Sequence, residues 1–92
     1  MAFALSGCST PGSPVPVGSP AAAVRAAFAP ATPFAVSCQG RTYFPDYVRY
    51  SECQGESEFI LIFRQADHQY AYTIRDGRVS EVSVSNYAIS YP

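Results

Sequence analysis

The dipeptide Asp76-Gly77 constrains the fold of this chain more than any other local feature. Such dipeptides favour two-residue hairpin turns in which both residues adopt a positive φ angle. Apolar side chains alternate with small or polar ones on both sides of it: Tyr70, Tyr72 and Ile74 before the turn, Val82 and Val84 after it. The pattern therefore predicts two antiparallel strands joined by a tight turn.

Further segments of strand length precede and follow this hairpin. Residues 59–63 form an unbroken apolar run, Phe-Ile-Leu-Ile-Phe, and the polar residues 65–68 predict a loop between that run and the hairpin. Short connections favour antiparallel pairing between strands that follow one another in the chain. Other strands are expected at residues 34–38, before the turn Gln39-Gly40, and at 47–53; a last strand at 87–91, where Tyr87, Ile89 and Tyr91 alternate, is left open as an alternative.

One helix is expected ahead of the strands. Ser19 can cap it, and Pro20 suits its first position. Residues 21–29 are rich in alanine, and Val24 and Phe28 are four residues apart, so they share a face that can pack on a sheet. The expected fold class is α+β: one short N-terminal helix packed on a four- to five-stranded antiparallel meander, stapled by a disulfide.

The apolar run raises the question of what covers each of its faces. Every second residue from Phe59 to Phe63 points to one face, whereas Ile60 and Ile62 point to the other. One short helix covers only one face. We expect the loop of residues 41–50 to fold over the two isoleucines; otherwise they form an exposed apolar patch that marks a partner or dimer surface.

The composition changes at about residue 20. Residues 9–20 read STPGSPVPVGSP and include four prolines, which are incompatible with a helix or a central strand. We expect an extended, solvated tether there, with a reach of roughly 35 Å. The chain then divides into a signal and lipobox segment at residues 1–8, the tether at 9–20 and a single small domain at 21–92.

The residues before the tether carry a resemblance. Leu5-Ser6-Gly7-Cys8 is similar to the lipobox of bacterial lipoproteins, and a Pro/Ser-rich tether is the expected context behind it. The resemblance implies that Cys8 receives diacylglycerol and anchors the protein to a membrane. Only residues 1–4 precede the motif, so a full signal peptide would need a longer start. Without lipidation, the segment would be a disordered tail with a stray thiol.

A second resemblance lies in the hairpin itself. The rhythm of residues 70–84, Y-x-Y-x-I-x-D-G-x-V-x-x-V-x-V, is similar to that of small envelope modules of the peptidase-propeptide type and of small outer-membrane lipoproteins of barrel assembly. This resemblance implies a helix followed by a meander, and it transfers no functional residue to this chain.

Three cysteines leave one pair once Cys8 is assigned to lipid. Cys38 and Cys53 have 14 residues between them, and a disulfide that closes such a loop stabilises a domain by about 3 kcal/mol. The sequence has no CxxC motif or Cys/His cluster that would favour zinc. We therefore expect a Cys38–Cys53 disulfide, the alternative being two buried free thiols in a cytosolic protein.

Charge and residue content disfavour several function classes. The chain has six arginines, no lysine and a net charge of −1, which disfavours nucleic-acid binding, and its apolar runs are too short to span a bilayer. The single histidine, His68 beside Asp67, suits a solvated loop better than catalysis. The acidic residues around Gly55 match no calcium-binding loop. We expect no catalytic residue, no metal site and no cofactor.

Residues 41–50, RTYFPDYVRY, are the best candidate for a binding surface. Tyrosine and arginine dominate interface hot spots, and a disulfide across the base of the loop would lower the entropy cost of binding. Alternatively, these aromatic residues form cross-strand pairs and core. The candidate residues are Arg41, Tyr43, Phe44, Asp46, Tyr47, Arg49 and Tyr50.

These observations predict a small exported lipoprotein of the bacterial cell envelope, anchored to a membrane through Cys8 and facing the periplasm or the exterior. Its domain would bind a protein partner or another envelope component without catalysis. An alternative is an inhibitor or exclusion-type lipoprotein that blocks an envelope enzyme or a surface receptor. An enzyme is disfavoured, because the chain has one histidine, no lysine and little material to enclose a pocket.

Overall fold

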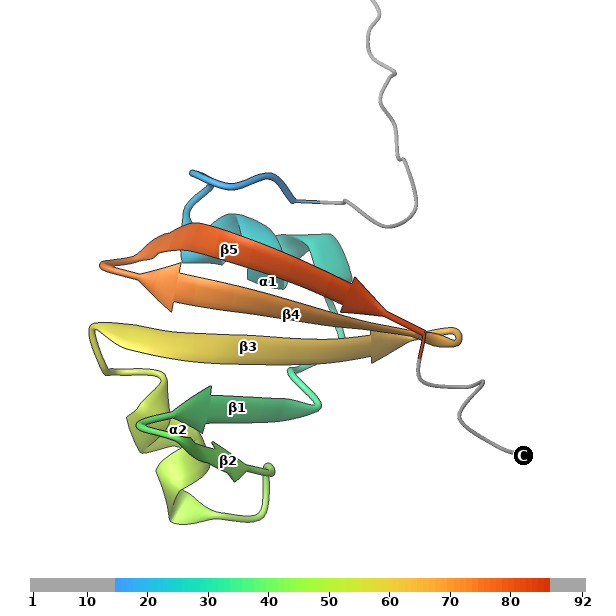
Figure 1. Cartoon of the computed structure of the whole chain (residues 1–92). Helices are drawn as coiled ribbons and strands as arrows, with labels where there is room; N and C mark the ends of the chain where they lie inside the picture. The colour runs from blue at the N-terminus through green and yellow to red at the C-terminus, as the bar shows by residue number, and fades with distance from the viewer. Residues whose placement is uncertain (1–14, 87–92) are drawn as a thin grey trace, which may run out of the picture.

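A computed structural model describes residues 15–86 of the chain (Figure 1). The described elements are α1 (Ala21–Phe28), β1 (Ala35–Cys38), β2 (Arg41–Tyr43), α2 (Val48–Cys53), β3 (Glu58–Gln65), β4 (His68–Arg75) and β5 (Arg78–Ser85). The strands form one antiparallel sheet in the order β2-β1-β3-β4-β5, so the predicted α+β class is confirmed. The lipidation candidate Cys8 and the strand predicted at residues 87–91 lie outside the described residues.

The sheet departs from a simple meander at one place. β1 pairs with β2 on one side and with β3 on the other, so β3 does not continue outward from β2. Between β2 and β3 the chain forms α2 and returns to the far side of β1. As a result β2 and β5 are the two edge strands of the described sheet.

The predicted hairpin turn at Asp76-Gly77 is confirmed, and the turn predicted at Gln39-Gly40 proves to join two strands in the same way. Asp76 and Gly77 have φ angles of 52° and 83°, and Gln39 and Gly40 have φ angles of 53° and 78°. Positive φ at both central residues matches the twist of the strands that such turns join. The two turns therefore set the register of β1 with β2 and of β4 with β5.

Residues 48–53 form a helix where a strand was predicted at 47–53, and that prediction is wrong. Aromatic and β-branched side chains in this segment favour a strand locally. However, Tyr50 and Cys53 are three residues apart and both pack against the core, which suits one face of a helix. On the exposed face Arg49 and Glu52 form an ion pair of 3.0 Å. Tertiary contacts therefore override the local preference.

α1 packs on the middle of the sheet. Its residues Val24 and Phe28 are buried, and the ring of Phe28 stacks on that of Phe63 with centroids 4.2 Å apart. The start of the helix differs from the expectation. Pro20 is extended and makes an isolated β-bridge with Arg78, and no side chain caps the first turn.

The residues just before α1 lie along the β5 edge, as the blue segment of Figure 1 shows. Val15 is buried, and Val79 accepts a backbone hydrogen bond from Gly18 and donates one to Ser19, both of 2.8 Å. We call residues 15–20 the strap. The sequence predicts a solvated tether for these residues, and that prediction is wrong for the strap. Pairing with an edge strand satisfies backbone groups of the strap and buries Val15.

Both helices lie on the same face of the sheet (Figure 1). A disulfide joins Cys53 at the end of α2 to Cys38 of β1. Arg25 of α1 donates a hydrogen bond to the side chain of Gln54, directly after α2. These contacts connect α1 to α2 and join α2 to strand β1, so the two helices form one layer on this face of the sheet.

The parts of residues 41–50 that form β2 and the start of α2 do not fold over Ile60 and Ile62, contrary to the expectation for them. The register pairs Ser37 with Ile60, so both side chains point to the face opposite that of Cys38. Because Cys38 holds α2 on its own face, α2 lies away from the two isoleucines. Ile60 and Ile62 lie on the face opposite that of α2, and each is half-buried.

Candidate binding site

Exposed aromatic side chains gather at the β2 edge. Phe44 and Tyr47 are 44% and 58% exposed, and Val48 at the start of α2 is 76% exposed. The ring of Tyr43 meets that of Tyr47 edge to face, with centroids 6.5 Å apart. We define the aromatic edge as these four residues together with Phe34.

Phe34 was not among the predicted binding residues. It directly precedes β1, is 39% exposed and meets the ring of Phe44 edge to face at 5.5 Å. The guanidinium of Arg64, from β3, lies over the Phe34 ring at 3.8 Å. Sequence spacing gives no signal for this cluster, because three separate segments contribute to it. Val48 was also missed, although it lies inside the predicted loop.

Two predicted arginines differ in their surroundings. Arg49 pairs with Glu52 and lies 5.7 Å from the centre of the Tyr43 ring, and the hydrogen bond that Arg49 donates to the Glu52 carboxylate raises the pKa of Arg49 above its usual value. Arg41, on β2, is exposed. Asp46 is exposed in the turn that follows Phe44. Arg49 is therefore held in place, whereas Arg41 is presented to solvent.

Tyr50 belongs to the framework rather than to the exposed surface. Its hydroxyl donates a hydrogen bond of 2.8 Å to the carbonyl oxygen of Pro33, and its own carbonyl oxygen accepts one of 3.0 Å from the side chain of Gln54. Its ring is partly buried against the core. The predicted loop thus divides, with Tyr50 holding the fold and Phe44 and Tyr47 facing outward.

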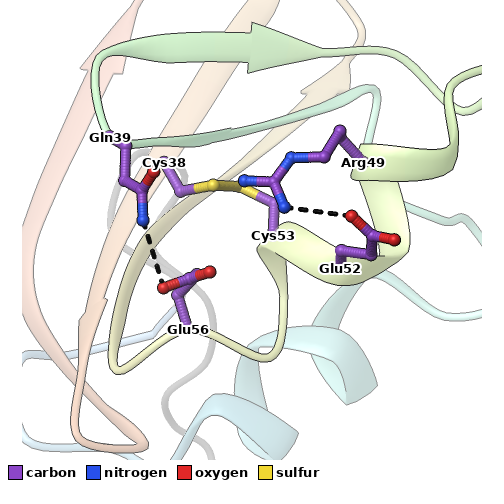
Figure 2. A network of polar contacts seen from close by, with 6 residues as sticks. All are labelled: Cys38, Gln39, Arg49, Glu52, Cys53 and Glu56. Carbon is purple, nitrogen blue, oxygen red and sulfur yellow. Dashed lines mark hydrogen bonds and ion pairs between the residues drawn. A yellow bond between two sulfur atoms is a disulfide. The ribbon is translucent and has the colours of Figure 1, made fainter.

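The Cys38–Cys53 disulfide, drawn in Figure 2, closes the segment that carries most of the aromatic edge. Cys38 and Cys53 have Cα atoms 5.8 Å apart and connect the β1–β2 hairpin to α2, which confirms the predicted pairing. Close by, Gln39 at the hairpin turn donates a hydrogen bond of 3.4 Å to Glu56, after α2. Both ends of the segment that carries the aromatic edge are therefore tied together.

The aromatic edge borders a hollow of about 410 Å³. A second hollow, of about 450 Å³, lies between the end of β1 and the start of β3, where Glu56 and Glu58 contribute to a more polar wall. The first hollow is lined by Arg41, Thr42, Tyr43, Phe44 and Tyr47. Its lining is mostly aromatic, which suits an apolar side chain of a partner.

The other residues considered for chemistry are engaged in separate contacts. His68 and Asp67 form an exposed pair, with 3.0 Å between Nδ1 and Oδ1. The glutamates of the acidic segment have three different partners: Arg49 for Glu52, Gln39 for Glu56 and Arg75 for Glu58. These contacts stabilise the surface and bring no group of reactive side chains together.

Neither described helix can cross a membrane, because α1 has 8 residues and α2 has 6. The aromatic edge, its hollow and its disulfide-bridged base are therefore the features of residues 15–86 from which a function can be argued. The chain matches no protein-family model, no curated protein and no solved structure.

Proposed function

We propose that this protein is a small bacterial envelope lipoprotein whose domain is a non-catalytic binding module. The aromatic edge is its contact surface for a protein partner or another envelope component. The observation that carries this proposal is the exposure of Phe34, Phe44, Tyr47 and Val48 on a base tied by a disulfide. Exposed apolar side chains that are contiguous and held rigidly are typical of interaction surfaces.

The proposal also includes a lipid anchor at Cys8, and the fold offers a suitable geometry for it. The strap enters the domain along β5, and the aromatic edge lies at β2, on the opposite side of the sheet. Five strands span about 19 Å between the outer two, at about 4.8 Å per strand. A domain held through its strap would therefore keep the aromatic edge free for a partner.

The anchor is tested in the natural host with the full-length gene. We expect the wild-type protein to carry diacylglycerol and to partition into detergent, and the Cys8→Ala variant to remain in the aqueous phase. A wild-type protein without lipid would contradict the anchor and leave the contact surface to be tested separately.

The contact surface is tested by capture from an envelope extract followed by reconstitution. The bait is the full chain, and the captured protein is then purified and titrated against wild type and variants. We expect Tyr47→Ser to weaken binding by about tenfold or more, as for a hot-spot residue. Val17→Ser is the matched control, because Val17 is 63% exposed but lies in the strap. Equal binding by both variants would contradict the proposal.

A further inference from the structure

The β2 strand presents unused backbone groups at the edge of the sheet. The Gln39-Gly40 turn closes on the pair Cys38 and Arg41, so these two residues exchange hydrogen bonds. Because hydrogen-bonded and non-bonded pairs alternate, the N–H and C=O of Thr42 point away from β1. Among residues 15–86, no backbone or side-chain group bonds Thr42 from that side. An edge with free backbone groups can accept a further strand.

The hollow of about 410 Å³ lies directly beside these groups, because Thr42 is part of its lining. Tyr43, Phe44 and Tyr47 form the apolar remainder of the wall. A strand that paired with Thr42 would thus have a pocket for one of its side chains. Main-chain bonds together with side-chain pockets are the basis of peptide recognition by strand addition.

The positive charge of Arg41 at this edge favours a ligand with a negative charge. Each of the other five arginines has a polar or ring partner within residues 15–86: Arg25 with Gln54, Arg49 with Glu52, Arg64 with Gln69, Arg75 with Glu58 and Arg78 with the carbonyl of Gly18. Arg41 has no such contact in that part of the chain. Asp46, the acidic residue of the same loop, does not line the hollow. An exposed guanidinium without an acidic partner suits a carboxylate of the ligand.

We propose that the β2 edge binds an extended, acidic peptide segment of a partner protein as a sixth strand of the sheet. This inference rests on the proposed function and names the partner's chemistry. The peptide backbone pairs with Thr42, a carboxylate of the peptide pairs with Arg41, and a bulky apolar side chain enters the hollow. Arg41 and Tyr43 are two residues apart and share a face of β2, so the acidic and apolar residues of the peptide are also two apart.

The probe is a displayed library of random nine-residue peptides, selected on the full chain. We expect the selected peptides to share an aspartate or glutamate two positions from an aromatic or large aliphatic residue. Titrated into isotope-labelled protein, they should shift the Thr42 amide resonance and slow its hydrogen exchange. Methylation of the peptide nitrogen that faces Thr42 should abolish binding, because it removes one donor of the strand pairing.

Arg41→Gln should weaken binding of the selected peptide by about tenfold or more, the loss expected for a charge-assisted hydrogen bond. Arg75→Gln is the matched control: Arg75 is also exposed and lies at the far end of β4, beside Glu58. Peptides without an acidic residue, resonance shifts centred on Ile60 and Ile62, or self-association of the chain through β2 would each overturn the inference, as would a selection that yields no binder.

The captured partner separates this inference from the proposed function. If Tyr47→Ser weakens binding of the partner and Arg41→Gln does not, the proposed binding of an acidic strand is contradicted, whereas the proposed contact surface is supported. If neither variant changes its binding, both proposals fail.

Discussion

The two edge strands of the described sheet, β2 and β5, differ in how far their edges are covered. At β5 the strap pairs with Val79 and buries Val15, so the chain closes part of this edge with its own backbone. At β2 no further strand is present among the described residues, and aromatic side chains stand exposed beside a hollow. An open edge invites pairing with other chains, and proteins commonly cover the edges they do not use. This contrast is the basis for our proposal that the β5 side serves stability and the β2 side serves contact.

Breaking the disulfide should have the largest effect and should act on the β2 side. In the double variant Cys38→Ala/Cys53→Ala, we expect the free energy of unfolding to fall by about 2–4 kcal/mol, because the unfolded chain gains the freedom of the open loop. Urea denaturation measures the loss. Amide hydrogen exchange should quicken first in β2 and α2. A change below about 0.5 kcal/mol, or equal loss of protection throughout the sheet, would contradict the role of the disulfide in holding the contact side.

Weakening the strap tests the other edge. Val15→Ala removes about two methylene equivalents of buried surface and should lower the free energy of unfolding by about 1–2 kcal/mol. Val17→Ala is the control in the same segment, because its side chain is 63% exposed. It should change stability by less than about 0.5 kcal/mol. Equal effects of the two substitutions in thermal or urea unfolding would show that the strap does not close the β5 edge.

Tyr72 lies between the two edges and gives a prediction for pH. Its side chain is fully buried, its hydroxyl has no hydrogen-bond partner among residues 15–86, and burial raises its pKa from 10 to about 12. The folded state thus holds the phenolic proton more tightly than the unfolded state. The stability linked to this group is therefore present below pH 10 and is lost as the pH rises from 10 to about 12.

The variant Tyr72→Phe removes the buried hydroxyl and should be as stable as wild type or more stable by about 1 kcal/mol at neutral pH. Its stability should also fall less steeply between pH 10 and 12 than that of wild type. Urea unfolding of both proteins across this pH range measures the difference. Parallel curves would show that Tyr72 does not contribute to the alkaline loss of stability.

The parts of the fold that local chemistry decides were predictable. Asp76-Gly77 favours positive φ angles, so the β4–β5 hairpin follows from this dipeptide. A turn was also predicted at Gln39-Gly40, but β2 was not, because residues 41–50 were expected to form a loop. The helix at residues 48–53 could not be predicted from its own sequence, because it depends on the disulfide between Cys53 and Cys38 and on the hydrogen bond from Tyr50 to Pro33. Those contacts join segments far apart in the sequence, so local propensity does not predict them.

The candidate site was predictable to a similar extent. The density of tyrosine and arginine in residues 41–50 predicts a contact surface, which stays a prediction, and Phe44 and Tyr47 of that segment are exposed. The sequence does not show that Tyr47 is exposed while Tyr50 packs against the core, because this difference depends on which face of α2 is turned toward the core. The contribution of Phe34 also required the sheet, since β1 brings it beside Phe44.

The aromatic edge itself should matter little for stability. Phe44 and Tyr47 are exposed, so the double variant Phe44→Ser/Tyr47→Ser should change the free energy of unfolding by less than about 0.5 kcal/mol per substitution. Urea denaturation measures this change. A loss of several kcal/mol would instead place both residues in the core.

The most direct test of the account compares binding and stability in this one variant. The dissociation constant for the captured partner is measured by calorimetry for wild type, Phe44→Ser/Tyr47→Ser and the control Val17→Ser. The account predicts that the double variant binds at least about tenfold more weakly while it unfolds at nearly the same urea concentration as wild type. Unchanged binding by the double variant, or a loss that Val17→Ser shares, would contradict the claim that the β2 side of the sheet is the contact surface.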